Sequence, residues 1–186
     1  MEHSIEPTAE EFREAKDIVE GILQTCEAVL SKDSDLQVFL SWRTHSSPEV
    51  LSEEEAKINI TTEDGWKNQL KTTVSQAYAQ SWSLEYKSNS YHWEELLTLG
   101  HSLRFAENIT GEKPELDSKD EIAENWSILR DEIQLSLVEE TEEISHYGFS
   151  LAYYLANELE ESHSLEDFPE LTMSDILNAG DNIFSQ

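Results

Sequence analysis

Basic side chains and cysteine are both scarce in this chain of 186 residues. It carries 12 lysines and arginines against 40 aspartates and glutamates, which gives a formal net charge of −28. A field of this sign repels DNA, RNA and anionic membranes, so direct nucleic-acid binding is the first function to exclude. The single cysteine, Cys26, cannot form an internal disulfide, and its place in an apolar helical repeat predicts a buried thiol.

Long apolar stretches are missing as well. No apolar run approaches the length that spans a bilayer, and residues 1–7 contain neither a basic region nor an apolar core. We therefore expect no membrane partner and no signal peptide, and we predict a cytoplasmic protein. A phosphate-binding loop, a dinucleotide-binding glycine pattern and paired cysteines are also missing from the sequence.

The composition is nevertheless that of a folded protein, with 38% hydrophobic residues and five tryptophans. The length predicts a single domain over residues 1–186. Two interpretations of the acidity stay open. Dense carboxylates keep proteins soluble in the salt-rich cytoplasm of a halophilic host, or they imitate DNA phosphates and occupy a nucleic-acid-binding protein as an inhibitor. The acids are spread along most of the chain instead of forming one block, which favours the first interpretation.

Hydrophobic spacing predicts a mostly helical α+β fold. Thr8 and Glu11 form a capping box that opens a helix to about Lys32. Residues 36–42 and 56–61 alternate as strands do, and Ser46-Ser47-Pro48 predicts a turn between them. Further helices are expected over about 66–84, 90–108, 118–133, 144–159 and 172–184. We expect the first of these to be capped by Asp64 or Thr62, the third by Ser118, and the last by Thr172 or Ser174.

Residues 76–82 read Gln-Ala-Tyr-Ala-Gln-Ser-Trp and have the spacing of a zinc-protease helix. In the motif His-Glu-x-x-His, two histidines one turn apart bind zinc and the glutamate acts as a general base. Here the two ligand positions hold Gln76 and Gln80, and the base position holds Ala77. The resemblance to a zinc protease extends to three later segments, residues 99–107, 147–153 and 171–175.

On these residues, roughly 57–184, the chain resembles a family of predicted zinc-dependent metallopeptidases. The family is zincin-like and of gluzincin type, its function is otherwise unknown, and it is common in halophilic archaea and bacteria. Tyr78 and Trp82 match its pattern His-Glu-Tyr-x-His-x-Trp. In its next helix, residues 100 and 105–107 match, but the place of the metal-binding glutamate is taken by Leu99. The resemblance implies a short N-terminal sheet, an active-site-like helix and a helical C-terminal half.

These substitutions remove the chemistry that the resemblance would imply. A carboxamide is a poor zinc ligand, alanine cannot transfer a proton, and leucine is aliphatic. We therefore expect that zinc and all catalytic residues are lost, and that the chain is an inactive, regulatory homologue with a protein or peptide in the former cleft. Candidate cleft residues are Tyr78, Trp82, His101, Tyr147 and Tyr153, although aromatic residues at helical spacing also form ordinary core.

A relocated metal site is a further alternative. His92 with Glu95, and Glu143 with His146, have the i, i+3 spacing of carboxylate–imidazole sites in helical bundles. An active hydrolase could use such a site near His92, His101 or His146. In so acidic a chain these pairs also arise by chance, so the inactive homologue is the favoured prediction.

Overall fold

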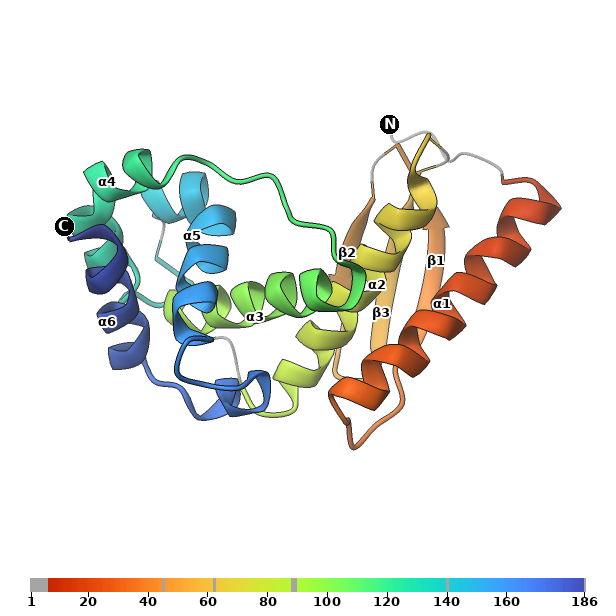
Figure 1. Cartoon of the computed structure of the whole chain (residues 1–186), viewed down its shortest axis with the longest axis horizontal. Coiled ribbons are helices and arrows are strands. Elements are labelled where there is room, and N and C mark those ends of the chain that lie inside the picture. The colour runs from red at the N-terminus through yellow and green to blue at the C-terminus, as the bar shows by residue number, and fades with distance from the viewer. Residues whose placement is uncertain (1–6, 45, 62, 88–89, 140, 186) are drawn as a thin grey trace. The chain divides into compact units, whose positions relative to one another are not determined.

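The computed structural model describes residues 7–44, 46–61, 63–87, 90–139 and 141–185. Its elements, shown in Figure 1, are α1 (Ala9–Val29), β1 (Gln37–Trp42), β2 (Ser47–Val50), β3 (Glu55–Ile60), α2 (Trp66–Leu84), α3 (His92–Thr110), α4 (Lys119–Glu132), α5 (Glu143–Leu159), the 3-10 helix η1 (Leu165–Glu170) and α6 (Met173–Phe184). The fold is α+β and mostly helical, with a small sheet near the N-terminus, which confirms the predicted class. No helix in the described ranges is long and apolar enough to cross a membrane.

Internal contacts divide the chain into two compact units. Unit 1 comprises Met1–Glu85 and Phe105–Glu112, and unit 2 comprises Tyr86–Arg104 and Lys113–Gln186. Helix α3 contributes its last turns to unit 1 and the rest to unit 2. The single domain expected from the length stays a prediction.

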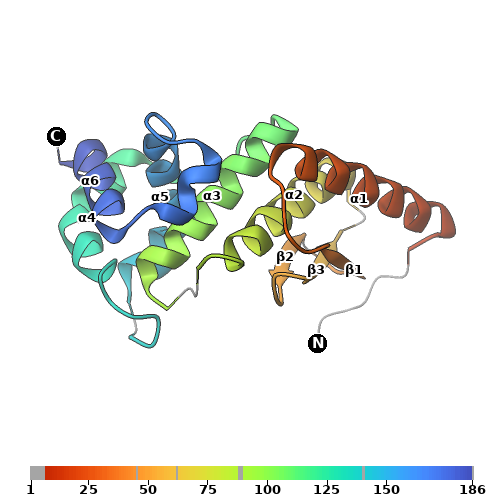
Figure 2. The same ribbon diagram turned by 90° about the horizontal axis from the view of Figure 1, so that it is seen from below.

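In unit 1, two helices cover one face of a three-stranded sheet (Figures 1 and 2). The strand order is β1-β3-β2, with β1 parallel and β2 antiparallel to β3. Residues 56, 58 and 60 of β3 are fully buried and face the helices, while Lys57 and Asn59 between them are half-buried. The alternation follows from the two-residue period of a strand. The core of the unit comprises Ala15, Val19, Trp42, Ala56, Ile58, Ile60, Leu70, Val74 and Ala77.

The thiol of Cys26 is fully buried between the two helices of unit 1, which confirms the prediction for this residue. Its Sγ lies 3.8 Å from Ser75 Oγ on α2. Burial raises the pKa of the thiol to about 11, so Cys26 is uncharged at neutral pH and serves packing.

Two local predictions in unit 1 are wrong. Of the turn expected at Ser46-Ser47-Pro48, Ser47 and Pro48 instead begin β2, in which Pro48 lies opposite Ile58. An edge strand tolerates proline because the missing N–H falls on the unpaired side. Asp64 does not cap α2, because the N-cap is Gly65, whose φ of 87° favours glycine. The alternative cap, Thr62, lies outside the described residues.

Unit 2 packs α4, α5, η1, α6 and the first part of α3 around a second core. As predicted, Ser118 caps α4 by accepting from the N–H of Asp120, and Thr172 forms a capping box with Asp175 at α6. Helix η1 was not foreseen in the sequence. The core comprises Leu96, Leu97, Ile122, Trp126, Leu129, Ile133, Ile144, Leu151, Ala152, Leu155, Ala156, Leu159, Phe168, Leu171, Ile176, Ala179 and Phe184.

Two glycines allow helices of unit 2 to approach closely. A methyl group at Gly100 on α3 would collide with the backbone carbonyl of Ala152 on α5. One at Gly180 on α6 would collide with the indole ring of Trp126 on α4. At Gly148 on α5 the nearest atom would be Cγ2 of Ile144 at 3.6 Å, an ordinary contact.

We therefore expect Gly100→Ala and Gly180→Ala each to destabilise the protein by about 1–3 kcal/mol, since neither the carbonyl nor the ring can yield without shifting a helix. The control Gly148→Ala should stabilise the protein by about 0.5–1 kcal/mol through helix propensity. Urea unfolding followed by circular dichroism measures all three. Equal midpoints for the three variants would contradict the close packing.

Candidate functional site

Helix α2 carries the two glutamines of the zinc-protease-like motif. Gln76 and Gln80 lie one turn apart and both are half-buried. Ala77, at the position of the general base, is fully buried in the core of unit 1 together with Val74 and Ile58. In the alignment that the resemblance implies, the base position is therefore filled by a methyl group that packs, and the ligand positions are filled by neutral amides.

Leu99, which the resemblance places at the third ligand position, lies on α3 in unit 2 and packs against the core of that unit. Two carboxamides and an aliphatic side chain do not fit a catalytic zinc, which needs imidazole, thiolate or carboxylate ligands. Within the part of the chain that the structure describes, no three side chains of His, Cys, Asp or Glu gather where they could hold a metal ion. We therefore derive no chemistry through zinc.

Tyr78 and Trp82, the two motif residues that match the family, are both about 4% exposed. The Tyr78 hydroxyl donates to the carbonyl of Leu30 at 2.7 Å, and Trp82 Nε1 donates to the carbonyl of Ser31 at 2.9 Å. These bonds fasten the segment that follows α1 onto α2. Both aromatic side chains therefore have a structural role inside unit 1.

A buried ion pair holds the same segment. Lys32 Nζ lies 3.2 Å from Glu85 Oε1, and the two side chains are only 2% and 11% exposed. Ser34 Oγ donates to the same oxygen at 3.0 Å, and Lys32 also donates to the carbonyl of Glu53 at 2.8 Å. Burial alone would raise the pKa of Glu85, but the hydrogen bonds from Ser34 and Lys32 and the charge of Lys32 outweigh it and lower the pKa.

Replacing Lys32 by methionine should leave Glu85 as an uncompensated buried charge and destabilise the protein by about 3–5 kcal/mol. The matched control is Lys57→Met, which removes one partner of an exposed pair with Glu49 in the same unit and should cost about 0–1 kcal/mol. Urea unfolding at neutral pH measures both. A similar small loss for the two variants would show that the Lys32–Glu85 pair contributes no more than a surface pair.

In unit 2, His101 is fully buried and its ring lies against that of Phe168, with 4.9 Å between centroids. Burial lowers its pKa to about 3, so the ring is neutral at physiological pH. Tyr153, 3% exposed, accepts a hydrogen bond from Arg104 at 3.0 Å, and Arg104 in turn binds Glu160 at 2.7 Å.

The remaining cleft candidate, Tyr147, is half-buried, and its hydroxyl lies 3.4 Å from the side-chain amide of Asn125. Four of the five candidates are therefore buried within their own units, two in unit 1 and two in unit 2. Tyr147 alone among them keeps appreciable exposed area. That the five residues line a binding cleft stays a prediction.

The two carboxylate–histidine pairs considered for a relocated metal site have ordinary surroundings. His92 is buried, with Nδ1 at 3.7 Å from Glu95 and Nε2 at 3.3 Å from the carbonyl of Glu139. His146 is exposed and lies edge-on to Tyr147. Neither pair is joined by a third ligand-type side chain in the described ranges.

The residues that sequence analysis missed are the long-range pairs Lys32–Glu85 and Arg104–Glu160. No local pattern marks them, because their partners come from distant parts of the chain. Comparison with protein-family models, with curated proteins and with solved structures finds no match in any of the three. The relationship to metallopeptidases therefore stays a prediction from the sequence motifs.

The buried ring of His101 predicts a specific pH dependence. Unfolded, it titrates near pH 6.5, and folded near 3, so between these values the unfolded state binds more protons. The contribution of the neutral His101 ring to the free energy of unfolding is fully present above about pH 6.5. It falls as the pH drops below that value, and about 2 kcal/mol of it is lost at about pH 5. The variant His101→Leu should lose this component, and the exposed control His146→Leu should retain it. Urea midpoints at about pH 7.5 and pH 5 test this, and an unchanged pH dependence in His101→Leu would contradict it.

Proposed function

We propose that this protein is a non-catalytic binding protein, an inactive homologue of a zinc metallopeptidase whose partner is a cytoplasmic protein or peptide. The proposal is carried by one observation, the face of α2. There Gln76 and Gln80 occupy the ligand positions, and Ala77, buried in the core, occupies the base position.

The chemistry of these side chains supports the proposal. Without three electron-rich ligands there is no Lewis acid to lower the pKa of a bound water from about 15.7 to about 7, so no hydroxide nucleophile forms at neutral pH. Two other reactive side chains do not replace it. Cys26 is a buried thiol with a raised pKa, and His101 is a buried neutral ring.

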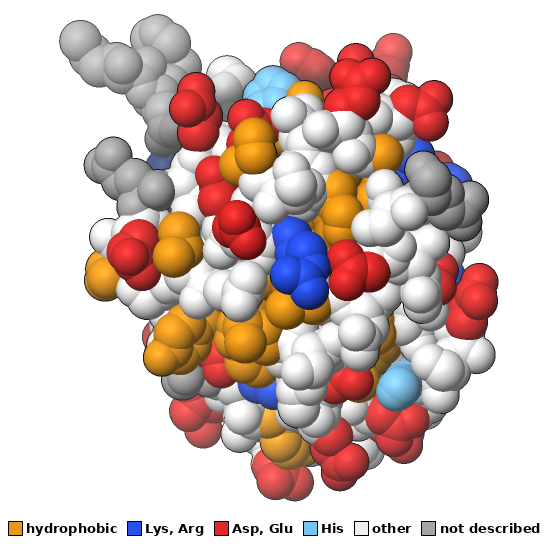
Figure 3. Space-filling view, turned by 90° about the vertical axis from the view of Figure 1, so that its left-hand side faces the viewer, with side chains coloured by type: hydrophobic (Ala, Val, Ile, Leu, Met, Phe, Trp, Pro, Cys, Tyr) orange, Lys and Arg blue, Asp and Glu red, His pale blue; other side chains and the backbone are white. Residues whose placement is uncertain are grey.

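Charge indicates the chemistry of the partner. The chain has forty acidic side chains and twelve basic ones, and several of the basic ones are already paired, as in Lys16–Glu20 and Lys67–Glu14. On the face shown in Figure 3, acidic side chains are scattered among neutral ones and basic side chains are few. Electrostatic complementarity therefore favours a basic polypeptide. The DNA-mimic alternative shares this preference, but in that case duplex DNA would compete with this protein for its partner.

Metal titration tests the loss of catalysis. The wild-type protein should hold no stoichiometric zinc after equilibration and should not hydrolyse peptides. The variant Gln76→His/Gln80→His should gain zinc affinity, because two imidazoles at i, i+4 on one helix face form a chelate. The single variant Gln76→His is the control and should gain little. Elemental analysis and calorimetry measure binding, and stoichiometric zinc with peptide hydrolysis in the wild type would refute the proposal.

A further inference from the structure

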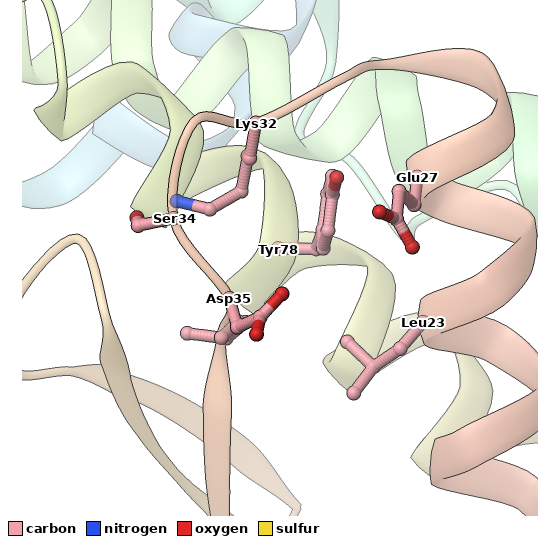
Figure 4. Close-up of a pocket in the computed structure, with 7 residues that line it drawn as sticks. Leu23, Glu27, Lys32, Ser34, Asp35 and Tyr78 are labelled. Atoms are coloured by element: carbon pink, nitrogen blue, oxygen red, sulfur yellow. The ribbon is translucent and has the colours of Figure 1, made fainter.

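A hollow of about 200 Å³ opens in unit 1 between α1, the segment after it and α2 (Figure 4). This volume is less than that of the pocket of a drug-sized ligand and suits a single extended side chain. The lining residues are Leu23, Glu27, Lys32, Ser34, Asp35, Leu36 and Tyr78.

Two carboxylates from different elements line this hollow. Glu27 comes from α1 and Asp35 from the segment before β1, and both are exposed. Figure 4 shows the two carboxylates turned toward the space beside Tyr78. Neither forms a hydrogen bond or an ion pair with any residue in the described part of the chain. Both therefore retain their full capacity to accept hydrogen bonds from a cation.

The basic residue of the lining does not neutralise these carboxylates. Lys32 is 2% exposed and is paired with Glu85, so its charge is already balanced. Glu85 Oε2 is itself buried without a hydrogen-bond partner in the described ranges. The potential in the hollow is accordingly negative. Burial is the main cause of the raised pKa of Tyr78, and Cys26, Glu27 and Glu85 add to it in that order.

The rest of the lining suits an aliphatic stem. Leu23 and Leu36 supply apolar groups to the lining beside Tyr78. The hydrogen bonds from Tyr78 and Trp82 to the carbonyls of residues 30 and 31 fix the segment that carries Asp35. Because the hollow is held in this way, a ligand has little of the site to order on binding.

We propose that this hollow binds a primary ammonium group at the end of an aliphatic chain. The ammonium lies between Glu27 and Asp35 and donates to both, and the stem lies against Leu23 and Leu36. The group is supplied by a lysine side chain of a basic polypeptide or by a free aliphatic amine. This proposal names a ligand class for the binding function proposed above. It rests on that function only for a polypeptide lysine as the source, and not for a free amine. A divalent cation fits less well, since calcium takes six to eight oxygen ligands.

Amine titration of the isotope-labelled full-length protein tests the site. The probes are Nα-acetyl-lysine-methylamide, which presents the side chain in a peptide setting, and 1,5-diaminopentane as the free amine. In about 0.15 M salt, which screens the diffuse surface charge, both should cause saturable chemical-shift changes at the amides of Glu27, Asp35 and Leu36. The probe that binds more tightly identifies the source of the ammonium group, a lysine side chain or a free amine. Nα-acetyl-norleucine-methylamide, which has the stem without the ammonium, should not bind.

The double variant Glu27→Gln/Asp35→Asn should weaken binding of both amines about tenfold, because two charge-assisted hydrogen bonds are lost. The control Asp17→Asn/Glu54→Gln removes the same charge from exposed positions of unit 1 outside the lining and should change affinity less than about twofold.

Shift changes that rise linearly with probe concentration, or equal weakening in the two double variants, would overturn the proposal and attribute the effect to the general acidic field. The experiment uses neither zinc nor a partner protein. Its failure would therefore leave the proposed non-catalytic function standing, and zinc-dependent peptide hydrolysis would leave the amine site standing.

Discussion

Twelve basic residues cannot neutralise forty acidic ones, and the structure depends on where those twelve lie. Two well-shielded ones, Lys32 and Arg104, join segments that are far apart in the chain. Lys32 fastens the segment after α1 to Glu85 at the end of α2, and in unit 2 Arg104 binds both Glu160 and Tyr153. A buried cation of this kind is strongly stabilising relative to the broken pair, because removal of one partner leaves a desolvated charge. Exposed pairs such as Lys57–Glu49 contribute far less.

The same scarcity shapes what the protein can bind. Lysine and arginine side chains that are paired inside the units do not balance the carboxylates at the surface, so the surface keeps a strong negative potential. That potential alone gives association with basic partners but little selectivity. In the amine site proposed above, the two carboxylates and the apolar walls of the hollow beside Tyr78 would add selectivity.

Helix α2 shows how residues that resemble a catalytic motif can serve packing. Ala77 fills the core against the sheet, and Tyr78 and Trp82 use their polar atoms to hold the backbone at residues 30 and 31. Gln76 and Gln80 are left half-buried with neutral amides. Burial and these hydrogen bonds hold the helix in unit 1.

The sequence by itself determined those features that depend on neighbours along the chain. The capping boxes at Thr8 and Thr172, the helical repeats and the alternating strands are short-range patterns, and the burial of Cys26 follows from its place in one of them. The mostly helical α+β class follows in turn from the order of these elements.

Only the tertiary structure decided the rest. Pro48 lies in a strand because β2 is at an edge of the sheet, and Lys32 is buried because Glu85 meets it from a distant helix. The hollow forms where α1, the segment after it and α2 converge. Contacts of this kind depend on which segments become neighbours in space, and that choice is made by the burial of whole helices and strands and leaves no mark on local spacing.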